Sequence, residues 1–400
     1  MDGADNVHWR VMNVLFVCKK FPVPPRDGET KAIWDAIERT RSNGHEVRIL
    51  SHLTTRHPVS SKDVERCPVP VRAVSLDNRV KPLRVLVNLL TGRSPHFARY
   101  DGAVIRSALT DLLGTWTPDV VQIEGSHLLG LVDVVRTHAS ETRIVLRLHN
   151  IEHDLLRAHG VRGALMWFLR QRARREEEAG WCRVDAVAAI SDAEAHVVRE
   201  RCGSDVHVAH VPMSVRVDDD PAPPRTGSQA SIGFLGSMDW LPNLEAVEWF
   251  LNAVWPLVRE RHPRADLNLA GRGESPEDWT RRPGVWHHGE VEDADDFVRR
   301  QDIVVMPFHR GGGVRIKMLE AMAAGRAIVG TTSGLAGLEI DDGVHALKAD
   351  DAASFADAVC RLIEDQDLAA RLGANALDLA RDQLTADRIS AAWEAVHSRG

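Results

Sequence analysis

Short apolar runs alternate with longer stretches of helical spacing along the whole chain. Runs such as Asn13–Val17 and Arg143–Leu148 consist mainly of apolar residues, as expected for parallel strands that are buried on both faces. Stretches such as Thr30–Asn43, Leu244–Arg261 and Ala353–Glu364 repeat their apolar side chains at helical spacing. This alternation predicts right-handed strand–helix–strand crossovers and an α/β fold with doubly wound parallel sheets.

The predicted strands fall into two groups. In the first half of the chain they are Asn13–Val17, Glu46–Leu50, Asp119–Ile123, Arg143–Leu148, Val184–Ile190 and Val206–Val211. In the second half they are Ser231–Leu235, Asp266–Ala270, Asp302–Met306, Ala327–Gly330 and Val344–Lys348. Between the groups, the segment 216–230 is rich in Asp, Pro, Gly and Ser and offers almost nothing to bury, which indicates a linker. We therefore expect two Rossmann-like domains, residues 1–215 and 231–384, facing a ligand-binding cleft, followed by a C-terminal helix at 385–400.

Composition narrows the class of protein. Four hundred residues with 44% apolar side chains suffice for two domains with cores of their own. The formal net charge of −7 gives no electrostatic case for binding nucleic acid. Five scattered cysteines without CxxC spacing argue against a disulfide framework or a zinc site and fit a reducing compartment. The chain shows no signal peptide and no run of 18 apolar residues, so we expect a soluble, cytoplasmic protein.

The longest basic cluster lies in Arg170–Arg175 and is followed at once by Glu176–Glu178. This pattern favours a solvated, salt-bridged helix face. The alternative is peripheral contact with the inner face of a membrane, built around the apolar stretch Leu165–Leu169.

The stretch Gly311–Ala323, GGGVRIKMLEAMA, is the most informative part of the chain. Its three glycines let the backbone pass close to a ligand, and the start of the following helix turns its N–H groups toward an anion. Arg315 and Lys317 add positive charge where the helix dipole disfavours it, so a bound polyanion explains them better than helix stability does. Glu320, one turn after Lys317, is an acceptor suited to a hydroxyl pair such as that of ribose. A solvated helix start with a Lys317–Glu320 pair is the alternative, but it leaves the glycines unexplained.

Further candidates follow predicted strands. The loop Lys19–Thr30 contains Gly28, whose neighbouring N–H groups are candidates to contact a diphosphate or an acceptor hydroxyl; an ordinary strand–helix turn is the alternative. His149 stands at the carboxyl end of a predicted buried strand, where a cleft residue and a structural histidine are both consistent with the pattern. Gly236 and Ser237 end the first strand of the second domain, and their backbone is a candidate phosphate binder.

GGGVRIKMLEAMAAGRAIV resembles the nucleotide-sugar motif of retaining glycosyltransferases of family 4, which have the GT-B fold. NVLFVCKKFPVPPRDGE, RLHNIEHDLL, AAISDAEA and FLGSMDWLPNLEAVEWF resemble other segments of that family in the expected order and together span nearly the whole chain. The resemblance implies a nucleoside-diphosphate sugar as donor, an acceptor bound mainly by the first domain, and no bound cofactor or metal. It also implies that His149 contacts the donor, that Val291 lies where the backbone holds the nucleobase, and that the last helix crosses back to the first domain.

Two positions depart from the family pattern. Many members carry an Arg and a Lys in the loop after the first strand of the second domain, whereas this chain reads Gly236–Ser237–Met238–Asp239–Trp240. Glu320 matches the second Glu of the family's paired glutamates, but Gly312 stands at the first. We interpret both as one exchange, in which Arg315 and Lys317 supply the diphosphate clamp and the Gly312–Gly313 backbone replaces the first Glu.

These observations predict a retaining glycosyltransferase. His149, Arg315 and Lys317 are then the expected catalytic residues. The donor-binding residues are expected to be Gly28, Gly236, Ser237, Val291, Gly312, Gly313 and Glu320. The alternatives are a nucleotide-sugar epimerase of the same fold and a catalytically silent sugar-nucleotide-binding protein. A dehydrogenase is disfavoured because no GxGxxG follows a predicted strand. The pattern leaves open the sugar, the base, and whether the acceptor is a glycan, a lipid or a small natural product.

Overall fold

The chain forms two compact α/β units in a computed structural model. The structure describes residues 10–55, 57–79, 81–158, 163–217, 230–310 and 313–398. The first unit comprises the described residues up to Met213 together with those from Ile389 onward, and the second runs from Ser214 to Arg388. Most of the predicted linker therefore lies outside the described residues. Among the described helices, none combines the length and apolar character that crossing a membrane would need.

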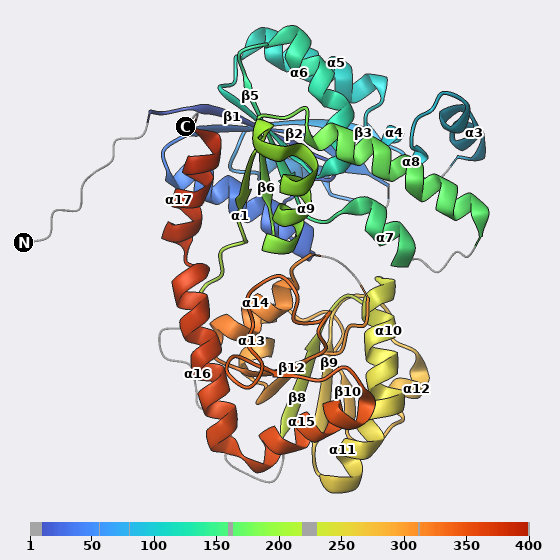
Figure 1. Ribbon diagram of the computed structural model, residues 1–400, viewed down its shortest axis with the longest axis vertical. Helices are drawn as coiled ribbons and strands as arrows, with labels where there is room; N and C mark the ends of the chain where they lie inside the picture. The colour runs from blue at the N-terminus through green and yellow to red at the C-terminus, as the bar shows by residue number, and fades with distance from the viewer. Residues whose placement is uncertain are drawn as a thin grey trace, which may run out of the picture. The chain divides into compact units, whose positions relative to one another are not determined.

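The first unit is built on a seven-stranded parallel sheet with the order β3-β2-β1-β4-β5-β6-β7 (Figure 1). Its strands are β1 Asn13–Cys18, β2 Glu46–Thr54, β3 Val71–Leu76, β4 Val120–Glu124, β5 Arg143–Leu148, β6 Ala186–Ala189 and β7 His207–His210. Side chains of β1 alternate between two cores. Leu15 and Val17 pack with α5 and α6 on one face, while Val14 and Phe16 pack with α1 and α17 on the other.

Helices cover both faces of this sheet. They are α1 Gly28–Ser42, α2 Ser61–Glu65, α3 Pro82–Leu90, α4 Pro95–Ala98, α5 Ala103–Thr115, the 3₁₀ turn η1 Ser126–Leu131, α6 Val132–His138, α7 Glu152–Ala158, α8 Ala164–Trp181, α9 Asp192–Cys202, the 3₁₀ turn η2 Gly203–Asp205 and α17 Ala386–His397.

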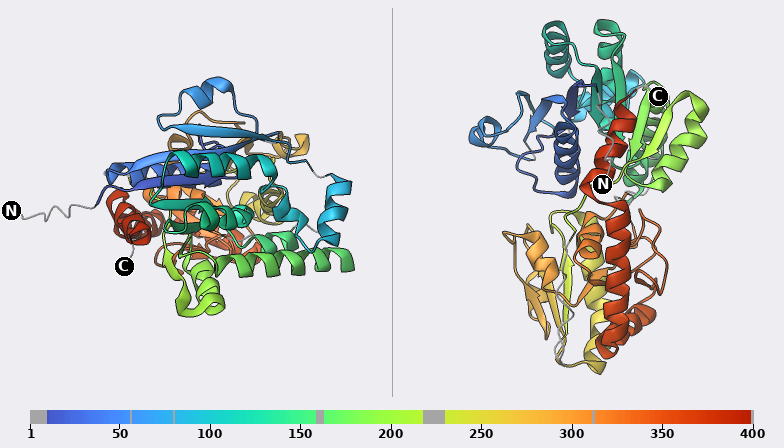
Figure 2. Two further views of the ribbon diagram at one scale, coloured as in Figure 1. Left: turned by 90° about the horizontal axis from the view of Figure 1, so that it is seen from above. Right: turned by 90° about the vertical axis from the view of Figure 1, so that its left-hand side faces the viewer.

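The last helix, α17, is part of the core of the first unit. Ile389, Trp393 and Val396 lie in one apolar cluster with the side chains of α1 and β1, and α17 runs beside α1 (Figures 1 and 2). The polar side of α17 is held by buried hydrogen bonds. The amide of Met12 donates to Nδ1 of His45 over 3.2 Å, so the other ring nitrogen carries the proton and donates to Glu394 over 2.7 Å.

The second unit repeats the architecture with a six-stranded parallel sheet of order β10-β9-β8-β11-β12-β13. Its strands are β8 Ser231–Leu235, β9 Asp266–Ala270, β10 Val285–His287, β11 Ile303–Met306, β12 Ala327–Gly330 and β13 Leu347–Lys348. The helices are α10 Leu241–Trp249, the π-helical turn η3 Phe250–Val254, α11 Trp255–Arg261, α12 Glu277–Thr280, α13 Ala294–Arg299, α14 Ile316–Ala323, α15 Ala352–Glu364 and α16 Gln366–Gln383. One apolar core, which includes Phe234, Phe250 and Phe308, holds these elements together.

The fold confirms the predicted class of two parallel α/β sheets, but the sequence pattern did not predict two of the strands. Both β3 and β10 lie at the edge of a sheet. Only Val74 in β3 and Val285 in β10 are buried. Continuous apolar runs indicate strands that are covered on both faces, and these two edge strands lack such runs.

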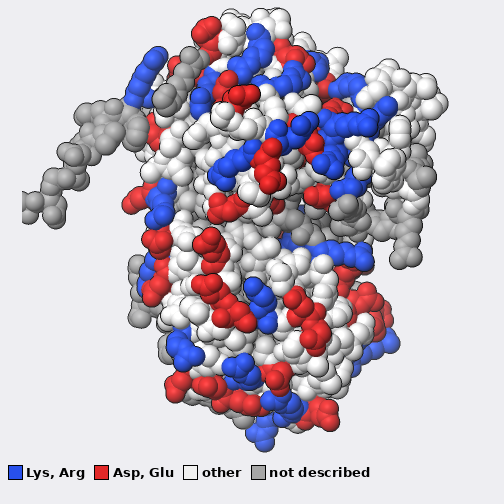
Figure 3. All heavy atoms as spheres, viewed as in Figure 1, with Lys and Arg blue, Asp and Glu red and all other residues white. Residues whose placement is uncertain are grey.

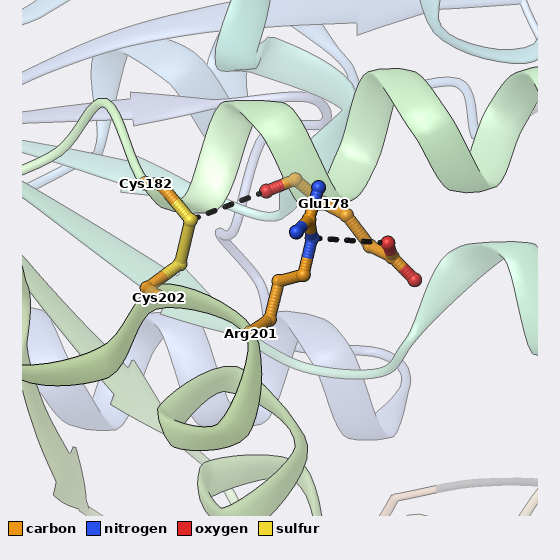
Figure 4. The surroundings of a disulfide bond; sticks show 4 residues. All are labelled: Glu178, Cys182, Arg201 and Cys202. Atoms are coloured by element: carbon orange, nitrogen blue, oxygen red, sulfur yellow. Dashed lines mark hydrogen bonds and ion pairs between the residues drawn. A yellow bond between two sulfur atoms is a disulfide. The ribbon is translucent and has the colours of Figure 1, made fainter.

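The expectation that the cysteines do not pair is wrong for Cys182 and Cys202, which form a disulfide. Cys182 directly follows α8 and Cys202 ends α9, and the topology brings the two Cα atoms within 5.3 Å of each other. Beside the bond, Arg201 pairs with Glu178 over 3.1 Å (Figure 4). The sequence separation of 20 residues matches no short motif, so this contact emerges only from the tertiary fold.

We expect Trp393→Ala to lower the free energy of unfolding of the first unit by about 3–5 kcal/mol, because it empties a fully buried indole site. Arg388→Ala, at an exposed position of the same helix, is the control and should change the stability by less than about 0.5 kcal/mol. Chemical denaturation of both variants measures the effect. A wild-type midpoint for Trp393→Ala would show that α17 is not needed for the core of the first unit.

Candidate functional site

Each sheet has a topological switch point, where ligands bind in open α/β folds. In the first unit β1 lies between β2 and β4, and in the second unit β8 lies between β9 and β11. Several of the predicted site residues lie after the strands at these points or after strands near them. Gly28 follows β1 and His149 follows β5. Gly236 and Ser237 follow β8, and the glycine-rich stretch with Arg315 and Lys317 follows β11.

The ammonium of Lys317 contacts one amide oxygen and two aromatic rings within the second unit. Its ammonium Nζ donates to Oδ1 of Asn243 over 2.9 Å. The same atom lies 4.6 Å from the ring centroid of Phe234 and 4.8 Å from that of Phe308, which is the range of cation–π contacts. A Cβ atom at Gly236 would lie 2.6 Å from this ammonium. Gly236 thus leaves the space that the ammonium needs beside the loop after β8.

The pKa of Lys317 is lowered to about 7, mainly because burial penalises the charged ammonium. The charge of Arg315 lowers the pKa further, and Glu320 partly opposes the shift. Near neutral pH this side chain is therefore divided between its charged and neutral forms. An anion placed nearby would favour the ammonium, so the group is suited to gain a full charge when a ligand arrives.

Arg315 occupies the N-cap position of α14 and is 5% exposed. Its guanidinium lies 4.6 Å from the ring centroid of Phe308 and donates through Nη2 to the carbonyl of Arg310 over 3.0 Å. Arg315 and Lys317 thus share one aromatic ring at the start of a helix whose dipole also favours an anion. Gly313, just before the helix, has φ of 72°, which a side chain would disfavour. Gly311 and Gly312 lie outside the described residues.

The loop after β8 is bonded within its own unit. The N–H of Gly236 donates to the carbonyl of Ala270 over 2.8 Å, so this amide is already satisfied. The carbonyl of Ser237 accepts from Nδ2 of Asn243 over 2.7 Å. Asn243 therefore bridges the loop to Lys317 through its two side-chain atoms. The motif as read from the sequence did not reveal this bridge, because Asn243 and Lys317 are 74 positions apart.

Two further predicted donor residues belong to the same unit. Glu320 is partly buried on α14, one turn after Lys317. Val291 packs against the apolar core after β10. His288, which precedes it, is held by Asn268 over 2.8 Å as part of the surface of the sheet.

In the first unit, a cluster of paired charges follows β1. The ammonium of Lys19 lies 3.0 Å from Glu29 and 3.7 Å from Glu152, and that of Lys20 lies 2.8 Å from Asp27 and 3.0 Å from Glu29. Burial raises the pKa of the Glu29 carboxyl, but the two lysines outweigh it and hold that pKa below its usual range. Carboxylates of the same unit thus already balance the charges of the two lysines. This makes the lysines weaker candidates for a diphosphate clamp than Arg315 and Lys317.

Gly28 is the first residue of α1, and Asp27 caps this helix by accepting from the N–H of Thr30 over 2.9 Å. The amide of Lys31 donates to the carbonyl of Asp27 over 2.9 Å. The Asp–Gly pair therefore combines an N-cap with a small first residue. Gly28 is predicted from the sequence, whereas the paired lysines near the helix start are not.

His149 is buried, and its Nε2 atom lies 2.8 Å from Oε2 of Glu124, which is itself fully buried. Gln122 donates to the other oxygen of Glu124 over 2.6 Å. The carboxylate therefore fixes the orientation of the imidazole. Among the described residues, Nδ1 of His149 has no hydrogen-bond partner although it is buried. A ring held at one nitrogen and open at the other is suited to contact a ligand.

Three potential metal ligands, His96, His127 and Glu152, place their ligand atoms within 4.8 Å of one another. The ammonium of Lys19 lies among them, 3.3 Å from Nδ1 of His127. Burial and the charge of Lys19 hold the pKa of His127 well below its ordinary value, so the neutral ring accepts from the lysine. A cation that bound these three side chains would have to displace Lys19, so we assign no metal to this cluster.

Comparisons with known proteins relate the second unit to a family. Residues 229–365 match the family model of the glycosyl transferases group 1. A curated relative, an uncharacterised 44.6 kDa protein in the cps region of Klebsiella pneumoniae, is 26% identical over 133 residues, which are 31% of this chain and 34% of that protein. The chain thus aligns with about a third of the length of this relative.

Solved structures resemble nearly the whole chain. Anabaena HepE, crystallised with UDP and glucose, is 15% identical and gives a TM-score of 0.67 over 95% of this chain and 97% of its own. Sucrose-phosphate synthase from Thermosynechococcus elongatus is 12% identical and gives 0.69 over 95% and 96%. A variant of S. aureus TarM is 9% identical and gives 0.70 over 97% and 100%. At such identities the likeness establishes the fold.

Two parallel Rossmann-like sheets, each with its site loops at a switch point, define a protein of the GT-B fold. Its second unit carries the group 1 domain, with the glycine-rich stretch inside the matched residues. The motif that resembles the retaining family 4 therefore lies within residues that match the group 1 glycosyltransferases, and the fold of the whole chain is GT-B.

We expect the stability of the second unit to rise with pH between 7 and 9 because of Lys317. In this window the unfolded chain keeps the proton on Lys317, whose ordinary pKa is 10.5, while the folded unit with a pKa of about 7 releases it. Fewer protons bound to the folded state mean a free energy of unfolding that increases, by at most about 1.4 kcal/mol per pH unit. Chemical denaturation at several pH values should show this rise in the wild type and not in Lys317→Met. The exposed Lys348→Met serves as the control and should behave like the wild type.

Proposed function

We propose that this protein transfers a sugar from a UDP-sugar to the hydroxyl of an acceptor, with retention of the anomeric configuration. The observation that carries the proposal is the pair Arg315 and Lys317 on the ring of Phe308, at the start of α14. The match of this segment to the group 1 family supports a nucleotide-sugar donor. The choice of UDP rests on similarity alone, since HepE has been crystallised with UDP and with UDP-glucose.

The chemistry places negative charge on the leaving diphosphate as the bond to the sugar breaks. A guanidinium that is 5% exposed and an ammonium on two aromatic rings are fixed before the reaction starts. Positive groups held in this way stabilise developing charge with little reorganisation. Lys317 adds to this stabilisation. An approaching diphosphate raises the low pKa of Lys317, so that the side chain becomes fully protonated in the complex.

Other residues would position the donor. Glu320 is proposed to accept hydrogen bonds from the ribose hydroxyls. The backbone around Val291 is proposed to hold the base, and that around Gly313 to pass close to the phosphates. His149, oriented by Glu124 and open at Nδ1, is proposed to contact the transferred sugar. The first unit is proposed to bind the acceptor, whose class the residues do not specify.

The proposal is tested by titrating the protein with nucleoside diphosphates in a calorimeter and by following donor turnover with acceptor mixtures. Tight binding of UDP and acceptor-dependent release of UDP would support it. Donor consumption without any acceptor, yielding an epimeric sugar nucleotide, would instead indicate an epimerase. Tight UDP binding without turnover on any acceptor would indicate a silent binding protein.

Arg315→Ala should lower kcat by roughly 10²–10³, the scale for losing one preorganised group that stabilises charge. Lys317→Ala should also lower kcat, with a smaller loss because Glu320 partly offsets the charge of Lys317. Arg300→Ala, at a surface ion pair of the same unit, is the matched control and should turn over normally. Turnover of all three is measured with and without a chelator, alongside their melting temperatures. Normal turnover of Arg315→Ala and Lys317→Ala would exclude them as the diphosphate clamp.

Glu320→Ala should weaken UDP binding by about 1.5–3 kcal/mol, the value of a hydrogen bond to a charged group. Because the proposed contact is to the ribose, the wild type should bind UDP more tightly than 2′-deoxy-UDP, and Glu320→Ala should lose this preference. Glu260→Ala, at an exposed position of α11, is the control. Calorimetric titration of both ligands against the three proteins measures the difference. An undiminished preference for UDP in Glu320→Ala would remove Glu320 from the ribose site.

A further inference from the structure

The helix α3 carries an apolar face that its own unit does not cover. Leu83, Leu86, Val87 and Leu90 follow one another at the spacing of a single helix face, and their exposed fractions are 74, 52, 50 and 78%. None of the residues of α3 is buried. An amphipathic helix ordinarily turns this face toward the core, so the exposure of four large aliphatic side chains indicates a surface made for contact.

The start of α8 extends this surface. Trp167 and Phe168 are 64 and 45% exposed. Arg172 joins the two helices, because its guanidinium donates to the carbonyl of Leu89 over 2.5 Å and lies 5.1 Å from the ring centroid of Phe168. We call the combined surface the α3–α8 patch. Its apolar members are Leu83, Leu86, Val87, Leu90, Trp167 and Phe168.

The charged residues of α3 and of the first part of α8 are all basic. No acidic residue occurs in α3, and none occurs in α8 before Glu176. Arg170 pairs with Asp154 over 2.8 Å and Arg174 with Glu178 over 2.5 Å, as the prediction of a salt-bridged helix face expects. Arg84 and Arg175 differ, since both are exposed and neither forms an ion pair with a described residue. Figure 3 shows uncharged surface over α3 with Lys and Arg side chains beside it.

We propose that the α3–α8 patch docks the protein onto the surface of an anionic lipid bilayer. Leucine and aromatic side chains enter the boundary between headgroups and acyl chains, while arginines beside them contact the lipid phosphates. A second copy of the chain fits less well, because a symmetric contact would place the arginines of both patches together with no patch carboxylate between them. The proposal does not depend on the donor or the reaction.

Co-sedimentation of the full chain with vesicles tests the proposal. One vesicle is pure phosphatidylcholine, and the other contains roughly one third phosphatidylglycerol, to supply the negative surface potential that attracts arginines. The wild type should bind the anionic vesicles at least about 10-fold more tightly than the neutral ones, and raised salt should reduce the difference. Equal, negligible sedimentation with both vesicles would overturn the proposal.

Variants separate the two parts of the patch. Leu83→Gln combined with Leu90→Gln should weaken binding to anionic vesicles at least about 10-fold, because both side chains leave the acyl region. Arg84→Gln combined with Arg175→Gln should remove the preference for anionic vesicles. Val11→Gln combined with Val104→Gln is the matched control, since these valines of the first unit are also exposed, at 66 and 63%, and belong to neither α3 nor α8. That control should bind like the wild type.

Other occupants of the patch give different results. A concentration-dependent dimer that Leu83→Gln with Leu90→Gln abolishes, seen by analytical ultracentrifugation without vesicle binding, would overturn the proposal in favour of a second copy. Vesicle binding that both double variants retain would also overturn it. Titration of the same variants with UDP keeps the two proposals apart, because the patch variants should bind UDP like the wild type whether or not they bind vesicles.

Discussion

The burial of both faces of each parallel sheet is the constraint on which the rest of this structure depends. Helices cover the faces of β1 and β8, so polar side chains find room mainly in the loops beyond the strand ends. Where the strand order reverses, beside β1 and beside β8, a crevice lies outside the carboxyl ends of the strands. Lys19 and Glu29 gather near one of these points, and Lys317 and Asn243 gather at the other. The architecture thus determines where charged side chains can lie, whatever the reaction of the protein is.

The two units treat buried positive charge in opposite ways. In the first unit, carboxylates surround Lys19 and Lys20, and each buried ammonium is paired. In the second unit, Lys317 rests on aromatic rings with an amide oxygen as its hydrogen-bond acceptor, and its pKa falls to about 7. Pairing with a carboxylate offsets the cost of burying an ammonium, whereas an ammonium whose acceptor is an amide oxygen keeps more of that cost. That cost is recovered when an anion binds, which is the physical reason to place the donor diphosphate in the second unit.

Peripheral docking would add a function to a part of the first unit that neither the charge cluster nor the sheet requires. The helix α3 contributes no buried residue to the core. Its link to α8 through Arg172 holds the aliphatic and aromatic side chains on one surface. Net charge says little about such a surface, because the chain as a whole is negative while the patch is basic and apolar.

The sequence by itself determined the class of fold and most of its strands, because buried parallel strands such as β11 and β12 must be apolar nearly throughout. It also located the glycine-rich stretch with Arg315 and Lys317, since glycine and paired cations at a helix start are unusual on grounds of local stability alone. It did not find β3 or β10, whose edge positions relax that requirement. Only the tertiary structure decided that Asn243 holds Lys317, that Glu124 orients His149, and that Cys182 meets Cys202. These are contacts between residues far apart in the chain, and their geometry arises when the sheets assemble.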